Sequence, residues 1–161
     1  MKPAVQIAVA AVLLAGATYL TWRHFAASAG PSEQAFFYDL SEKKLFPAPR
    51  GLVPPIAGMN DAVEDGVRAV VFSPTGRPED KRTWQIAYLE TYAPELKREL
   101  EAARSSGEAP RLSRTAAQGL RRVRLESDPE WVALDSPEGE RIVSRWTQLG
   151  VGGQTPAICT P

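Results

Sequence analysis

Histidine and cysteine are almost missing from this sequence, with one residue of each among 161. The single histidine, His24, lies beside an apolar segment near the amino terminus, so the chain after it has no imidazole to act as a base near neutral pH. Ser-His-Asp and Cys-His sites are therefore excluded from that region. The lone Cys159 also excludes an internal disulfide and a cysteine-based zinc site. We expect no catalytic residues of these kinds.

Net charge is the second absence, because 19 basic residues balance 19 acidic ones. No overall field attracts nucleic acid, and we expect neither nucleic acid nor nucleotide as a partner. The run GVGG at 150–153 follows an expected helix instead of joining a strand to one, so it is not a phosphate-binding loop. The acidic residues Asp61, Glu64 and Asp65 match no Ca²⁺-loop spacing. We therefore expect no metal and no cofactor.

Charge is also missing from residues 4–22, AVQIAVAAVLLAGATYLTW. At about 1.5 Å per residue this run spans roughly 28 Å as a helix, close to the ~30 Å hydrocarbon core of a bilayer. The aromatic residues Tyr19 and Trp22 suit the membrane interface, and Arg23 and His24 mark the start of the aqueous side. We expect residues 1–25 to be a transmembrane signal anchor in the inner (cytoplasmic) membrane.

A cleaved signal peptide is the alternative, because Ala27-Ser28-Ala29 fits the small-x-small pattern before a cleavage site. The apolar run is longer than the ~7–15 residues of a typical cleavable segment, and bulky residues separate it from that triplet. Retention is favoured, with the domain on the periplasmic side as in most short amino-terminal anchors. Cleavage would instead release the protein into the periplasm. The small and polar residues 26–35, with Gly30-Pro31, predict a linker.

The remainder, 36–161, predicts a single α+β domain that begins with strands. Apolar runs on either side of residues 41–44 predict a hairpin, with Phe36, Tyr38 and Leu40 on one face. The proline-rich segment 47–58 is expected to be irregular. Further strands are expected at 67–72, 84–90, 120–126 and 131–134.

Two helices are expected to pack on one face of this mostly antiparallel sheet. The first begins at Pro94 and ends at Gly107. The second begins after Ser136, whose hydroxyl suits a helix cap. Its expected buried face is Ile142, Val143, Trp146 and Leu149. The connector 108–119 and the tail 150–161 are expected to form no element.

Five arginines in 111–124 form the strongest local charge asymmetry: Arg111, Arg114, Arg121, Arg122 and Arg124. They are a candidate patch for an anionic lipid or glycan. The favoured interpretation is that they pair within the chain, because residues 126–140 carry six acids. Likewise Trp84, Trp131 and Trp146 are expected in the core, with a sugar-stacking platform as the alternative.

Four segments carry a resemblance to known proteins: FFYDLSEKKLF at 36–46, GVRAVVFS at 66–73, IAYLETYAPELKRELEAA at 86–103 and PAICTP at 156–161. In this order they resemble an uncharacterised group of small bacterial proteins that have one amino-terminal membrane helix and no assigned activity. The resemblance implies membrane anchoring. Some members carry a cysteine pair where this chain reads SPTGRPEDK, so no metal or redox role is carried over.

These observations predict a membrane-anchored, non-catalytic module that binds a protein partner or a cell-envelope component. The alternative is an accessory subunit of a membrane enzyme or secretion assembly. Small residues within 4–22, which allow close helix contact in a bilayer, favour that alternative slightly. An enzyme that uses only carboxylates, tyrosine and basic residues is the third and least favoured class.

Overall fold

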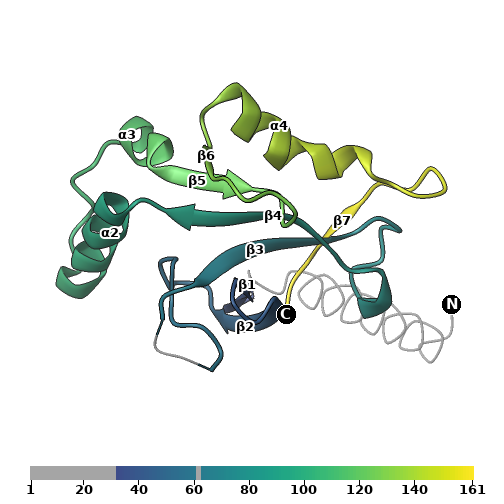
Figure 1. The fold of residues 1–161 in the computed structure, drawn as a ribbon, viewed down its shortest axis with the longest axis horizontal. Helices are drawn as coiled ribbons and strands as arrows, with labels where there is room; N and C mark the ends of the chain where they lie inside the picture. Colours follow the sequence, from purple (N-terminus) through teal and green to yellow (C-terminus); the bar gives the residue numbers. More distant parts are fainter. Residues whose placement is uncertain (1–31, 61–62) are drawn as a thin grey trace, which may run out of the picture. The chain divides into compact units, whose positions relative to one another are not determined.

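An antiparallel sheet organises the computed structural model, which describes residues 32–60 and 63–161 (Figure 1). Its strands are β1 (Gln34–Asp39), β2 (Lys44–Pro49), β3 (Gly66–Ser73), β4 (Gln85–Tyr92), β5 (Arg121–Arg124), β6 (Val132–Ala133) and β7 (Ala157–Cys159). The spatial order is β2-β1-β3-β4-β5-β6, and β7 pairs with β3. Three α-helices accompany the sheet in the described residues: α2 (Pro94–Ser106), α3 (Arg114–Gly119) and α4 (Pro137–Arg145). The expected α+β class with a mostly antiparallel sheet is confirmed.

The β1–β2 hairpin forms as expected, with Phe37 opposite Phe46. Asp39 closes it: its Oδ1 accepts hydrogen bonds from the backbone N–H groups of Ser41 and Glu42, and its Oδ2 accepts one from Met59 N–H at 2.7 Å. These bonds, that of Glu42 first, lower the pKa of Asp39 because they stabilise its charged form. The hairpin turn and the loop before β3 are therefore tied to one carboxylate.

The proline-rich segment differs from the expectation, because Pro47 and Pro49 belong to β2. An edge strand tolerates proline, whose missing N–H costs no ladder bond on the open side. The following residues are held by cations that donate to backbone carbonyls. Arg68 Nη2 donates to Arg50 O, Arg104 Nη1 to Gly51 O, and Lys97 Nζ to Pro55 O at 2.6 Å. The segment is thus a fixed part of the domain surface.

The carboxyl-terminal tail also differs from the expectation, because residues 157–159 form β7. Val71 pairs with Cys159 and Ser73 with Ala157. Strand β1 pairs with the same edge of β3, but only at Gly66, Val67 and Arg68. Two strands thus share one edge of β3, and Cys159 is buried in the core, where burial raises the pKa of its thiol.

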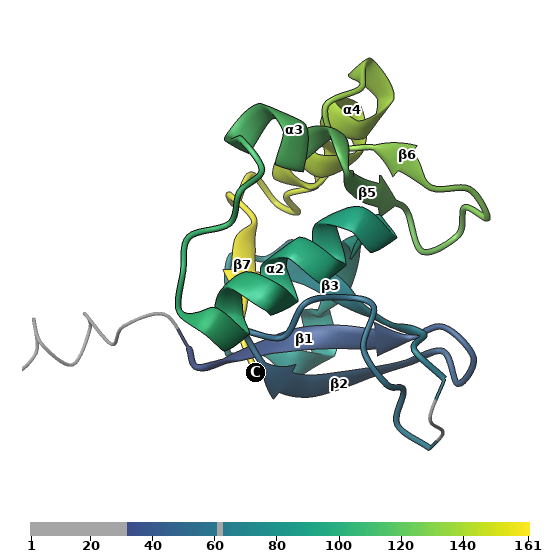
Figure 2. The ribbon, with the colours of Figure 1, turned by 90° about the vertical axis from the view of Figure 1, so that its left-hand side faces the viewer.

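Apolar side chains fill both sides of the sheet. One cluster contains Phe36, Tyr38, Val67, Ala69, Val71, Leu89 and Cys159, with Trp84, Ile86 and Trp131 packed against it. On the other side Phe72 contacts Trp146, their ring centroids 5.8 Å apart, and Leu96 of α2 is 2% exposed. Two views of the ribbon place α3 and α4 beyond β5, at the opposite end of the sheet from β2 (Figures 1 and 2).

The helix boundaries follow their capping residues. Pro94 occupies the first turn of α2, and Gly107 ends it in the left-handed conformation. Ser136 Oγ accepts a hydrogen bond from Gly139 N–H at the start of α4. Both expected helices are confirmed. Leu149 is 42% exposed, contrary to expectation, because α4 ends at Arg145 and a 3₁₀ turn breaks its periodicity.

One helix was not expected. In the connector 108–119, Ser113 Oγ accepts a hydrogen bond from Ala116 N–H, and α3 begins at Arg114, directly after Ser113. A six-residue helix is too short to show a clear apolar periodicity.

Within the described part of the chain, no helix combines the length and the apolar character that crossing a bilayer requires. The expected anchor at 1–25, its interface residues Tyr19, Trp22, Arg23 and His24, and most of the 26–35 linker lie outside this part.

Candidate functional site

Two adjoining hollows at the ends of β4 and β5 share Ile86 and Glu126. The larger encloses about 520 Å³ and is lined by Tyr38, Lys43, Leu45, Trp84, Gln85, Ile86 and Glu126. The smaller encloses about 250 Å³ and adds Ala87, Leu125, Ser127, Arg145, Trp146 and Leu149. The larger hollow opens on the side of the sheet that carries Trp84, and the smaller on the side where Trp146 contacts Phe72. We call the lining of the larger hollow the aromatic groove. It combines aromatic and aliphatic walls with a few groups of both charges.

One hydrogen bond fixes the polar part of the groove. Tyr38 OH donates to Glu126 Oε1 at 2.8 Å, across 88 positions of sequence. Burial, and then the hydrogen bond and charge of Glu126, raise the pKa of Tyr38 to about 12, with Arg124 acting in the opposite direction. The phenol therefore stays neutral at physiological pH and serves as a hydrogen-bond donor.

The tryptophans beside this pair are held in fixed orientations. Trp84 Nε1 donates to Pro78 O at 2.9 Å, and its ring meets the Phe36 ring edge-on at 5.1 Å between centroids. The Arg124 guanidinium lies 4.9 Å from the centroid of the Trp131 ring. Trp84 and Trp131 are both only partly buried. Their rings contribute to the core and also to the surface.

The five arginines of the candidate anionic patch have separate surroundings. Arg121 Nε donates to the buried Glu90 Oε1 at 2.6 Å. Arg124 stacks on Trp131 and donates from Nη1 to Asp128 O. Arg122 lies opposite Ala133 in the β5–β6 pair, Arg111 is exposed and bonds through its backbone N–H to Glu99, and Arg114 begins α3.

The expected pairing of these arginines with the acids of 126–140 takes a different form. The partner of Arg121 is Glu90 on β4, the neighbouring strand. Arg124 does reach the 126–140 segment, but it binds a backbone carbonyl there. Glu90 lies on a strand that is distant in sequence from Arg121, so the local pattern of charges does not predict this pairing.

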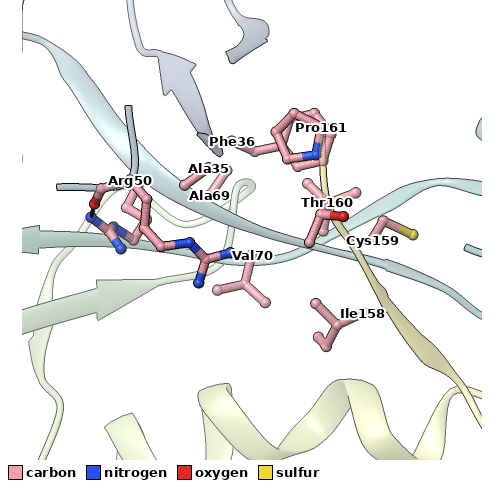
Figure 3. A pocket seen from close by; sticks show the side chains of 11 residues that line it. Ala35, Phe36, Arg50, Ala69, Val70, Ile158, Cys159, Thr160 and Pro161 are labelled. Carbon is pink, nitrogen blue, oxygen red and sulfur yellow. Dashed lines mark hydrogen bonds between the residues drawn. The ribbon is translucent and has the colours of Figure 1, made fainter. Parts of the chain in front are cut away.

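A third hollow lies at the shared edge of β3, where β1 diverges and β7 takes its place (Figure 3). It encloses about 160 Å³. Its lining is Ala35, Phe36, Arg50, Arg68, Ala69, Val70, Val71, Ile158, Cys159, Thr160 and Pro161. Among the described residues, Ala69 and Val70 have no strand partner on this edge. We call this the edge hollow.

Arg68 forms one wall of the edge hollow. Its Nη2 donates to Arg50 O and Leu52 O, and its guanidinium lies 5.5 Å from the Phe37 ring centroid. Its Nε is buried and has no hydrogen-bond partner among the described residues. The wall is therefore rigid and positively charged.

The acidic stretch has structural partners where the structure describes it. Glu64 pairs with Lys97 at 2.7 Å, and Asp65 Oδ2 accepts a hydrogen bond from Ser41 N–H. Asp61 lies outside the described residues. Within residues 32–60 and 63–161, no group of three or more His, Cys, Asp or Glu side chains is placed to hold a metal ion.

Comparisons of the chain with protein-family models, with curated proteins and with solved structures each found no match.

The Tyr38–Glu126 contact makes a testable prediction. A raised pKa means that the folded chain favours the neutral phenol. The contribution of the neutral Tyr38 phenol to folding stability is therefore complete below pH 10.0 and is lost as the pH rises through about 12. Glu126→Gln should lower the pKa of Tyr38 towards 10.0, as measured by titrating phenolate absorbance, with Tyr38→Phe identifying the signal. An unchanged titration in Glu126→Gln would contradict the contact.

Proposed function

We propose that this protein is a membrane-anchored, non-catalytic module that binds a protein partner through the aromatic groove. The anchor is residues 1–25 in the inner membrane, and the domain faces the periplasm. Support for the anchor comes from the sequence: an uncharged run at 4–22 with aromatic residues at its carboxyl end.

The composition of the aromatic groove carries the binding proposal. Tyr38 and Trp84 line it, with Lys43 and Glu126 as its charged groups. Tryptophan, tyrosine and arginine are the residue types that dominate binding energy at protein interfaces. Tyr38 is already buried, so a partner would cover mainly the partly buried Trp84 ring and the exposed side chains of Lys43 and Gln85.

The orientation of the rings adds to this argument. Trp84 is fixed through its indole N–H and Tyr38 through its hydroxyl. Side chains that are ordered before binding lose less conformational entropy when a partner docks. The groove is therefore preorganised for a protein surface.

Photo-crosslinking in native membranes tests this proposal. A benzophenone amino acid at Gln85, an exposed residue that lines the groove, should capture one recurrent protein that mass spectrometry identifies. The matched control carries the same group at Ser105, an exposed position on α2, and should not capture it. The captured band should also weaken in Trp84→Ala.

Other outcomes separate the competing functions. Capture of an envelope polymer would replace the protein partner by a cell-envelope component. Capture of one subunit of a larger membrane complex would favour the accessory-subunit function. Equal capture from Gln85 and Ser105, or none from either, would overturn the groove as a binding site.

A further inference from the structure

The free edge of β7 is the feature that the aromatic groove leaves unexplained. β7 pairs with β3 on one side, and in the described residues its other side has no strand partner. Neighbouring residues of a strand direct their backbone N–H and C=O groups to opposite edges. At least one of residues 157–159 therefore points its backbone groups outward, available to another strand.

The other two sheet edges are protected against such pairing. β2 contains Pro47 and Pro49, and β6 is only two residues long. Proline and very short strands are common means of protecting an edge. At β7 the prolines Pro156 and Pro161 stand outside the strand, so its three residues stay open to pairing.

The segment that carries β7 contributes only uncharged side chains. Residues 146–161 include no Asp, Glu, Lys or Arg, although these types make up 24% of the chain. Three of the five exposed large hydrophobic residues of the described chain lie in this segment: Leu149, Val151 and Ile158. Ile158 is the one of these three that belongs to β7 itself, where it also lines the edge hollow.

The edge hollow lies directly beside this strand and supplies a pocket. Phe36, Val70, Ile158 and Pro161 surround it, with Arg50 at the end away from Ile158 (Figure 3). Arg68 adds a second guanidinium group to the lining. The hollow thus offers apolar contact to one side chain and positive charge to another.

We propose that β7 and the edge hollow bind an extended peptide segment of a partner protein by strand addition, and that this segment carries an acidic residue and an apolar residue on the same face. Strand addition takes its affinity from main-chain hydrogen bonds and its specificity from pockets for alternate side chains. Residues two apart in a strand share a face, so the acidic residue stands two positions from the apolar one. The segment belongs to the partner expected for the proposed function, and it binds a different surface from the aromatic groove.

Two blocked heptapeptides test this, with the full chain in detergent micelles and fluorescence anisotropy as the measurement. The sequences are Thr-Val-Thr-Asp-Thr-Val-Thr and the same peptide with lysine in place of aspartate. The aspartate peptide should bind saturably, and the lysine peptide at least about tenfold more weakly, because like charges oppose each other at an interface. Arg50→Glu should reverse this preference.

A matched pair of variants tests the apolar part. Ile158→Gln should weaken binding of the aspartate peptide several-fold, whereas Val63→Gln, the same change at another exposed residue, should leave it unchanged. Ile158 is 45% exposed and Val63 61%, so neither substitution places a polar group in the core and both variants should fold. Amide hydrogen exchange at 157–160 should slow when the peptide binds, because added main-chain hydrogen bonds protect those groups.

Each contrary result is distinct. No saturable binding of either peptide, equal affinity for both, or unchanged exchange at 157–160 would overturn strand addition at β7. If crosslinking from Gln85 persists in Ile158→Gln, the proposal for the aromatic groove stands even when the proposal for β7 fails. The two proposals can therefore fail separately.

Discussion

Gly139→Ala should destabilise the protein by about 2 kcal/mol or more, although alanine is the better helix former by about 1 kcal/mol. Gly139 lies in the first turn of α4, which packs against β5 and β6, and it is buried. A Cβ atom there would meet Ala133 O and Leu134 O, the second at 2.7 Å. Both are backbone atoms, so relief requires α4 to move away from the sheet.

Gly119→Ala is the matched control, because Gly119 also lies in a helix. A Cβ atom there would meet only Asp135 Oδ2 at 3.3 Å, and a carboxylate can rotate away. This variant should be unchanged or slightly more stable, within about 1 kcal/mol. Urea denaturation of the full chain in detergent gives both values. Equal stability of the two variants would show that α4 does not approach the sheet this closely.

The approach of α4 also shows what sequence can and cannot predict. Pro94 and Gly107 for α2, and Ser136 for α4, act through backbone groups within a few residues of themselves. Their effects are local, so the helices were predictable. Gly139 acts through carbonyls of the preceding strand and turn, and no local pattern marks it as a contact point.

The prolines and the tail show the same limit in the strands. Pro47 and Pro49 argue against a strand until the position of β2 at the edge of the sheet is known. The segment around Cys159 is too short and too rich in glycine and proline to predict a strand alone. It becomes one because the edge of β3 is open where β1 diverges.

The candidate sites were less predictable than the fold. The aromatic groove joins Tyr38 to Glu126, and the edge hollow joins residues 35–36 to 158–161. Only the pairing of distant strands brings these residues together. The sequence does identify Trp84 and Trp146 as important apolar positions, without indicating that each lines a different hollow.

The ion pair of Glu90 and Arg121 leads to the second large effect. Glu90 is 4% exposed, and its Oε1 lies 2.6 Å from Arg121 Nε. Arg121→Met keeps most of the side-chain volume but leaves a buried carboxylate without its partner. The free energy of unfolding should fall by about 3 kcal/mol or more, because an uncompensated buried charge costs more than the ion pair contributes.

A double-mutant cycle separates this charge effect from lost packing. Glu90→Gln with Arg121→Met should recover at least about 1 kcal/mol of the loss seen in Arg121→Met alone, because the buried group is then neutral. Arg68 lies opposite Glu90 in the β3–β4 pair and Tyr92 also hydrogen-bonds its side chain, so a loss below about 1 kcal/mol in Arg121→Met would mean that these two groups stabilise the carboxylate. In that case Arg68→Met should lower the free energy of unfolding by more than Arg121→Met does. The main cation that stabilises Glu90 would then be Arg68 on β3 and not Arg121 on β5.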